Sequence, residues 1–211
     1  TEKPRIGANL PSRMARACGA LLVLLLASVV LGASVGAVTF PPSVVLKVIL
    51  NHLFAAGYSV PEIADRIVWE IHVPRMLLGA LVGMSLAMAG AALQGLLLNP
   101  LADPYMVGVS SGAAAGAGIA VLLGLSGVLM GVGIPLCAFL TALLAVAVVY
   151  LLARRGGKLS MLSFILAGVV VGALMWAVLT FVMTVASQDL EKIVFWTMGS
   201  LAGSDPWWRV T

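Results

Sequence analysis

Charged side chains are scarce in this sequence. They make up 9% of the 211 residues, against about 25% in a typical soluble domain. The longest stretches without a charged residue cover 17–38, 76–98, 105–153 and 159–188. Each is long and apolar enough to cross the hydrocarbon core of a bilayer. The shortage of charge therefore excludes a soluble globular domain and predicts an all-α membrane protein, a polytopic bundle of transmembrane helices.

Cysteine, histidine and nucleotide-binding motifs are also sparse. The two cysteines, Cys18 and Cys137, lie in separate apolar stretches and form no CxxC motif. There is no GxxxxGK(S/T) loop and no HExxH motif, and His52 and His72 are not spaced as metal ligands. We therefore expect no cofactor, no metal ion and no enzymatic activity in this chain. The net charge of +4 does not indicate nucleic-acid binding, because the basic residues flank apolar stretches and form no stripe.

The stretch 105–153 is too long for one span. As a single helix it would measure about 74 Å, whereas the hydrocarbon core is about 30 Å thick. The sequence Gly124-Leu125-Ser126-Gly127 is the natural turn within it. We therefore expect one membrane domain over 1–211, with five spans at about 17–38, 76–98, 105–124, 129–152 and 160–186, and a short external helix at about 190–203.

Basic residues indicate the orientation of the chain. One cluster precedes the first apolar stretch and a second lies between the fourth and fifth expected spans, so both fall on one side of the membrane. Cytoplasmic segments carry such an excess of Lys and Arg, which predicts a cytoplasmic N-terminus. A secretory signal peptide is the alternative, but its apolar core would be about 7–15 residues, shorter than the stretch 17–38. The basic cluster before the first apolar stretch consists of Lys3, Arg5, Arg13 and Arg16. The cluster between the fourth and fifth expected spans consists of Arg154, Arg155 and Lys158.

A polar turn interrupts the apolar sequence at residues 99–104. Pro100 and Pro104 lack an N–H and disfavour a helical residue before them. Asn99 and Asp103 can hydrogen-bond the local backbone and cap the next helix. These residues predict a tight re-entry between two apolar helices.

Glycines recur at a spacing of four residues. Gly108, Gly112 and Gly116 therefore share one helix face. In a lipid-embedded helix, such a face lets another helix approach closely. Pairs with the same spacing, which predict further packing faces, are Gly79 with Gly83 and Gly168 with Gly172.

The sequence from Val73 to Gly118 resembles one family, the permease subunits of ABC importers for vitamin B12, haem and iron-siderophores (the FecCD type). Two departures are visible: His72 and Leu98 stand where the family often has an arginine or, at the second position, another polar residue. The matching elements are Pro74-Arg75, Gly79, Gly83, Gly90, Gln94, Asn99-Pro100-Leu101-Ala102, Pro104, Gly108 and Ser110-Ser111-Gly112-Ala113.

The resemblance implies a docking site at the outer mouth of the permease. Arginines there engage acidic residues of an extracytoplasmic substrate-binding protein in this family. Arg75 occupies the matched Pro-Arg position and inherits that role as a hypothesis. His72 replaces the other arginine, which would weaken the contact or make it depend on pH.

The resemblance also implies partners and a mechanism. Two permease copies pair as a homodimer in the cytoplasmic membrane of a bacterium or archaeon, and cytoplasmic ATPase subunits drive alternating access. The cargo would be an iron-siderophore first, with haem or cobalamin behind it. Relative to this family the chain corresponds to the N-terminal part only, so we expect a truncated or partial sequence.

Three uncharged side chains within the spans have two interpretations each. An intramembrane amide such as Gln94 usually hydrogen-bonds another helix, and a pathway-lining role is the alternative. Met175 and Trp176 are more often packing residues. The resemblance implies that their helix borders the central pathway, which keeps a pathway role open for them as well.

Other classes of membrane protein stay as alternatives. An ion-coupled secondary carrier or channel needs an intramembrane charge or a broken helix at mid-membrane, and the spans contain no charge. A non-transporting membrane scaffold is the alternative if the chain truly ends at Thr211.

Overall fold

The computed structural model describes residues 10–36, 38–155 and 158–201. Lys3 and Arg5 of the first basic cluster, and the last residues of the external helix expected at 190–203, lie outside this described part. Almost all regular structure in the described residues is helical. The exception is an antiparallel pair of two-residue strands, β1 (Arg154–Arg155) and β2 (Lys158–Leu159).

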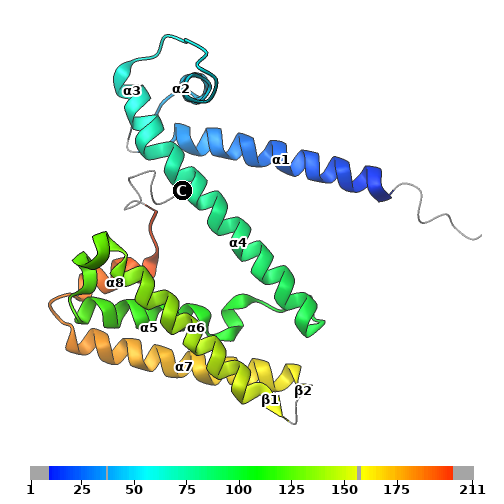
Figure 1. Cartoon of the computed structure of the whole chain (residues 1–211), viewed down its shortest axis with the longest axis vertical. Coiled ribbons are helices and arrows are strands. Elements are labelled where there is room, and N and C mark those ends of the chain that lie inside the picture. The colour runs from blue at the N-terminus through cyan, green and yellow to red at the C-terminus, as the bar shows by residue number, and fades with distance from the viewer. Residues whose placement is uncertain (1–9, 37, 156–157, 202–211) are drawn as a thin grey trace, which may run out of the picture. The chain divides into compact units, whose positions relative to one another are not determined.

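The helices follow one another with short connections (Figure 1). The four longest, α1, α4, α6 and α7, have 21 to 25 residues each. In chain order the helices are α1 (Leu10–Ser34), α2 (Pro42–Phe54), α3 (Glu62–Arg66), the π-helix η1 (Ile67–His72), α4 (Val73–Leu97), the 3-10 helix η2 (Pro104–Val107), α5 (Val109–Leu122), the 3-10 helix η3 (Leu125–Gly131), α6 (Gly133–Ala153), α7 (Met161–Val185) and α8 (Leu190–Met198).

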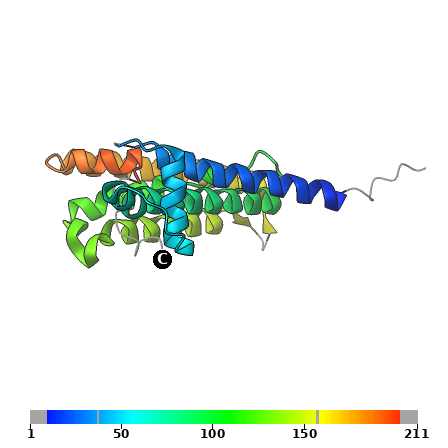
Figure 2. The same ribbon diagram turned by 90° about the horizontal axis from the view of Figure 1, so that it is seen from above.

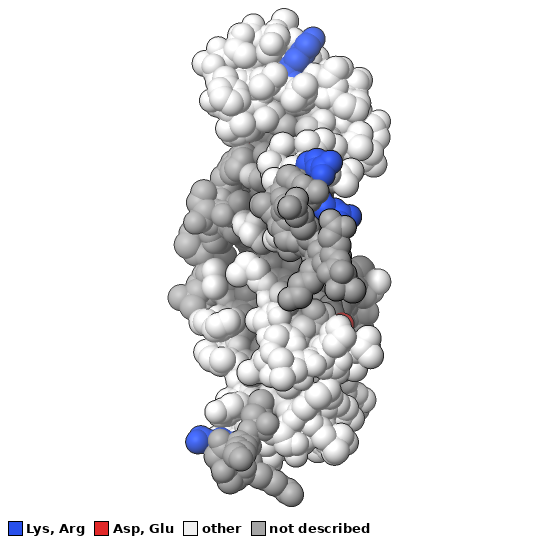
Figure 3. Space-filling view, turned by 90° about the vertical axis from the view of Figure 1, so that its right-hand side faces the viewer, with Lys and Arg blue, Asp and Glu red and all other residues white. Residues whose placement is uncertain are grey.

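Several helices are long and apolar enough to cross a membrane. They are the segments Arg13–Ser34, Glu62–Leu97, Gly133–Ala153 and Met161–Val185. On the face shown in Figure 3 the described residues are uncharged over broad areas, with a few separate basic side chains. The all-α membrane bundle predicted from the sequence is confirmed. Helix α5, in the expected span 105–124, has 14 residues and measures about 21 Å.

The chain divides into two compact units, which are described separately. The first comprises Thr1–Gly83 and Leu201–Thr211. In it, α2 crosses the end of α1 at a steep angle (Figures 1 and 2). Val45 and Val48 on α2 are buried in a cluster with Ala33 of α1 and with Val68 and Val73.

Pro74 does not break the helix in which it lies. The second span was expected to begin at residue 76, whereas helical backbone runs without interruption from Glu62 to Leu97. The π-helix η1 directly precedes Pro74, and the Val73 N–H donates to the Val68 carbonyl across its wider turn. A proline inside a helix removes one backbone hydrogen bond and crowds the preceding turn. The wider π turn accommodates the proline ring, so the helix can continue.

The second unit, Met84–Ser200, is built on α5, α6 and α7. These three helices run side by side, and α8 folds back along α5 and α7 (Figure 1). Small residues dominate the centre of the unit. Ala114, Ala115 and Ala120 on α5 are buried, as are Ala142 and Ala145 on α6.

The glycine face of α5 packs against α6 without a gap. A Cβ atom at Gly112 would lie 2.8 Å from the Cβ of Ala145, and one at Gly116 would lie 2.6 Å from the carbonyl oxygen of Cys137. Real Cβ atoms do not approach other atoms so closely, so this helix pair depends on glycine at both positions.

The first prediction concerns this close approach. Gly116→Ala should lower the free energy of unfolding by about 1–3 kcal/mol, because the added methyl group overpacks the α5–α6 contact. Thermal unfolding of the full-length protein in detergent measures the effect. The matched control is Gly19→Ala in α1, where a Cβ meets nothing within 4 Å. Equal destabilisation by both substitutions would show that the α5–α6 contact is not the cause.

Candidate functional site

The turn between α4 and η2 is held by its own side chains. Leu98 has a φ of 49°, and the Asn99 N–H donates to the Gln94 carbonyl at 3.1 Å, which ends α4. The Oδ1 of Asn99 accepts the Leu101 N–H at 3.0 Å, and the Oδ1 of Asp103 accepts the Tyr105 N–H at 2.8 Å. Asp103 is therefore the N-cap of η2.

Gly108 joins η2 to α5 and places both against α7. Its φ of 79° lies in the left-handed region that favours glycine. A Cβ there would lie 3.4 Å from both the Gly168 carbonyl oxygen and the Gly172 nitrogen. Gly168 itself leaves room for the carbonyl of Met106. The structure thus brings together three of the predicted packing glycines at the point where η2 meets α7.

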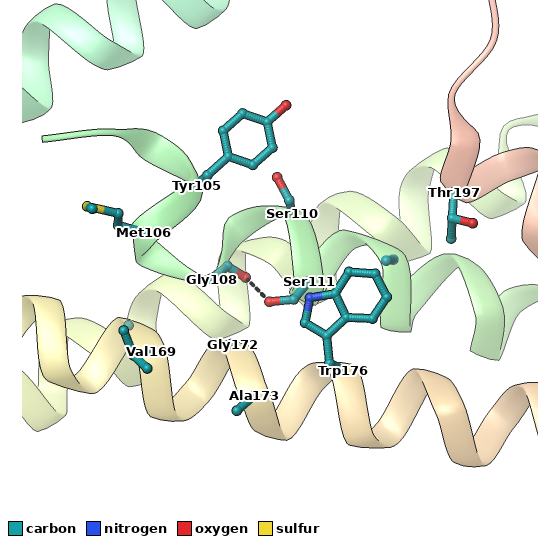
Figure 4. Close-up of a pocket in the computed structure, with 12 residues that line it drawn as sticks. Tyr105, Met106, Gly108, Ser110, Ser111, Val169, Gly172, Ala173, Trp176 and Thr197 are labelled. Atoms are coloured by element: carbon teal, nitrogen blue, oxygen red, sulfur yellow. Dashed lines mark hydrogen bonds between the residues drawn. The ribbon is translucent and has the colours of Figure 1, made fainter.

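A groove opens beside this contact, between η2, α5 and α7 (Figure 4). We call it the α5–α7 groove; its volume is about 570 Å³. Figure 4 shows that it extends from Tyr105 and Met106 at one end to Thr197 of α8 at the other, along the α7 helix. It is lined by Tyr105, Met106, Gly108, Ser110, Ser111, Ala114, Gly168, Val169, Gly172, Ala173, Trp176 and Thr197.

The lining of the groove is uncharged and combines apolar surface with a few polar groups. None of its twelve residues carries a formal charge. The hydroxyl of Ser111 donates to the Gly108 carbonyl at 3.0 Å, and that of Thr197 donates to the Val194 carbonyl at 2.8 Å. The side chains of Tyr105 and Trp176 are 66% and 56% exposed. The groove therefore presents hydrogen-bonding groups and aromatic surface, with no formally charged side chain in its lining.

The predicted pathway residues do not meet in one place. Trp176 lies in the α5–α7 groove, whereas the neighbouring Met175 packs against the buried core of the unit. Gln94 lines a separate hollow of about 250 Å³ together with Asp103 and Pro104. Among the three candidates, the geometry favours Trp176 as a residue that a bound molecule could contact.

The other predicted packing glycines differ in their surroundings. A Cβ at Gly79 would be in ordinary contact, 3.4 Å from Leu201. A Cβ at Gly83 would meet nothing within 4 Å among the described residues. Among the predicted packing glycines, the close contacts are therefore those of Gly112, Gly116 and Gly168.

His72 and Arg75, the predicted docking residues, differ in exposure. The His72 side chain is buried, with 6% exposed, and its Nδ1–H donates to the Ala33 carbonyl at 2.6 Å. That carbonyl belongs to the last turn of α1, where carbonyls lack intrahelical partners. His72 therefore caps α1 from 39 residues away. Arg75 is half-buried at the start of α4, and docking by either residue stays a prediction.

Sequence reasoning did not assign a site role to four polar residues of the groove, Tyr105, Ser110, Ser111 and Thr197. Tyr105 directly follows the polar turn and Ser110 lies two residues after Gly108, so nearness to the turn and to this glycine was a usable signal. Thr197 had no such signal. It reaches the groove only because α8 folds back over α5.

These apolar helices and the polar turn between them define a multi-pass membrane protein. The model of the FecCD transport family matches residues 23–211 of the sequence. The chain belongs to the FecCD transport family.

Curated relatives carry related names. The chain is 43% identical over 147 residues to the cobalamin import system permease protein of Halobacterium salinarum, covering 70% of this chain and 39% of the relative. It is 42% identical over 139 residues to the vitamin B12 import system permease protein of Klebsiella pneumoniae, covering 65% of this chain and 41% of that relative. An uncharacterized ABC transporter permease protein of Bacillus subtilis is 36% identical to this chain over 178 residues, covering 83% of this chain and 50% of that relative.

A solved structure shares the arrangement of the helices. It is an inward-facing conformation of a metal-chelate type ABC transporter, with a TM-score of 0.72 and 25% sequence identity. The match covers 93% of this chain and 56% of the other. The chain thus spans about half the length of the relatives it matches.

The second prediction concerns the cap on α1. His72→Leu should lower the free energy of unfolding by about 1–3 kcal/mol, because the buried Ala33 carbonyl loses its donor. His72→Gln keeps a side-chain N–H and should cost less. Thermal unfolding of the full-length protein compares the two. Equal melting temperatures for both variants would assign the effect to lost ring packing instead of the hydrogen bond.

Proposed function

We propose that this chain forms part of the permease subunit of an ABC importer that carries a metal chelate across the cytoplasmic membrane. Membership of the FecCD transport family carries the proposal. The uncharged α5–α7 groove supports it, because a large chelate can pass along such a surface without being held by an opposite charge. As a permease, the chain would supply a path and no catalysis.

Cobalamin is the first cargo to test. Two relatives that are 42–43% identical are named as cobalamin or vitamin B12 permeases. This choice replaces the earlier expectation, attached to the family resemblance, that an iron-siderophore is the first cargo. Iron-siderophores and haem remain the alternative cargoes, since the family resemblance covers all three.

The proposal assigns the driving force to other subunits. Cytoplasmic ATPase subunits would drive alternating access, a substrate-binding protein would deliver the chelate outside, and a second permease copy would complete the path. In this arrangement the N-terminus is cytoplasmic. The basic residues Arg13, Arg16 and Arg154 support that orientation.

Reconstitution of the whole transporter tests the proposal. Full-length permease, purified with its ATPase and loaded with its binding protein, should take up cyanocobalamin into proteoliposomes only when ATP is hydrolysed. Uptake driven by an ion gradient without ATP would favour a secondary carrier. Failure to co-purify with an ATPase, together with no uptake of any chelate, would favour a scaffold.

The third prediction concerns the proposed docking residue. Arg75→Glu should weaken binding of the substrate-binding protein by about 10-fold or more, because it sets like charges against each other. Arg154→Glu, in the strand pair expected on the cytoplasmic side, is the matched charge-reversal control. Biolayer interferometry on the full transporter measures both. Unchanged affinity for the Arg75 variant would remove this residue from the docking surface.

The fourth prediction concerns access to the groove. In a cysteine-free background, Trp176→Cys should react with a water-soluble thiosulfonate reagent about 10-fold faster than Leu179→Cys, since reactivity follows exposure. Leu179 is fully buried on the same helix and serves as the control. Equal, slow labelling would mean that another part of the permease covers the groove.

A further inference from the structure

We infer that the α5–α7 groove selects a cargo whose surface is uncharged and rich in carbonyl oxygens. The hydrogen-bond donors that recognise these oxygens would be Tyr105, Ser110 and Trp176. The inference rests on the proposed function, because it concerns the chemical class of the chelate that the permease carries.

Three donors in the groove are not used by the protein itself. Within the described part of the chain, the hydroxyls of Tyr105 and Ser110 and the indole N–H of Trp176 make no hydrogen bond to another residue. They come from three different elements, η2, α5 and α7, and line one groove (Figure 4). By contrast, the hydroxyls of Ser111 and Thr197 already donate hydrogen bonds to backbone carbonyls.

The chemistry of these donors defines the acceptor they need. An indole N–H can donate but cannot accept. A cargo that displaces water from the groove also removes the water molecules that accept hydrogen bonds from the three donors. Unless the cargo itself provides acceptors, each donor is left without a hydrogen bond, which weakens binding of the cargo. Carbonyl oxygens of amides are acceptors that carry no net charge. A ferric trihydroxamate is also uncharged as a whole, because its three hydroxamate anions balance the Fe³⁺ ion.

The absence of charge in the lining sets the second condition. None of the twelve lining residues could neutralise a charged group on the cargo. A desolvated charge without a partner costs far more than an amide with a hydrogen bond. An anionic chelate should therefore be disfavoured. A cation over the Trp176 ring is the competing possibility, and the experiment below includes it.

Transport of defined probes by the complete transporter tests the cargo class. The probes are cyanocobalamin, an uncharged ferric trihydroxamate, an anionic ferric tris-catecholate and a cationic trihydroxamate derivative. We expect ATP-dependent uptake of one or both uncharged probes and little of the charged ones. Uptake of only a charged probe would overturn the inference and leave the importer function intact. Uptake of none would overturn the proposed function and the inference with it.

Conservative variants then test the three donors with the transported uncharged probe. Tyr105→Phe, Ser110→Ala and Trp176→Phe each remove one donor with little change in volume. Each should lower the uptake rate about 3- to 10-fold, the range that one hydrogen bond supports. Tyr150→Phe is the matched control, because Tyr150 is exposed on α6 outside the groove. Wild-type rates in all three groove variants would overturn the inference.

A charge-supplying variant separates recognition from structure. Ser110→Lys should shift the preference toward an anionic probe, such as cyanocobalamin with one carboxamide hydrolysed to the acid. Tyr105→Lys, at an exposed site, is the second variant if the first does not fold. The ratio of uptake of acid to amide should rise about 10-fold or more over wild type, because the lysine supplies the missing counter-charge. An unchanged ratio in a folded lysine variant would overturn the inference.

Discussion

The close approach of α5 to α6 and α7 is the constraint on which the second unit depends. In lipid, apolar side chains gain little from leaving the solvent, so helices associate through tight packing of small residues. Gly112 and Gly116 provide that packing on the side of α6. Gly108 and Gly168 provide it where η2 meets α7. The groove exists because this second contact holds η2 close to α7 while α5 continues along it.

The polar turn controls which side chains reach the groove. Leu98 ends α4 in a left-handed conformation, and Asp103 caps η2 by accepting the Tyr105 N–H. The cap fixes the first residue of η2 in space, and Gly108 then turns the chain into α5. Tyr105 and Ser110 therefore fall on either side of one glycine, and both line the groove. The residues of the turn are structural, yet they position the polar groups beside them.

Local patterns in the sequence predicted much of this arrangement. The lack of charge predicted the apolar helices, and the spacing of Gly112 and Gly116 predicted the face that packs on α6. Gly108, expected on the same face, instead precedes α5 and contacts α7. Long-range contacts could not be predicted in this way. The helix containing Pro74 continues because a π turn absorbs the proline, and His72 caps a helix whose end lies 39 residues earlier. Both features depend on how the backbone folds in three dimensions, which the spacing of nearby residues in the sequence does not reveal.

The scarcity of charge has the same physical basis in the helices and in the groove. A charged side chain is costly in the hydrocarbon core, and the residues of α5 and α7 satisfy this condition on every face. The groove inherits an uncharged lining from the helices that form it. None of the twelve lining residues carries a formal charge. The tight contacts at Gly112, Gly116 and Gly168 join η2, α5, α6 and α7 into one closely packed group of helices.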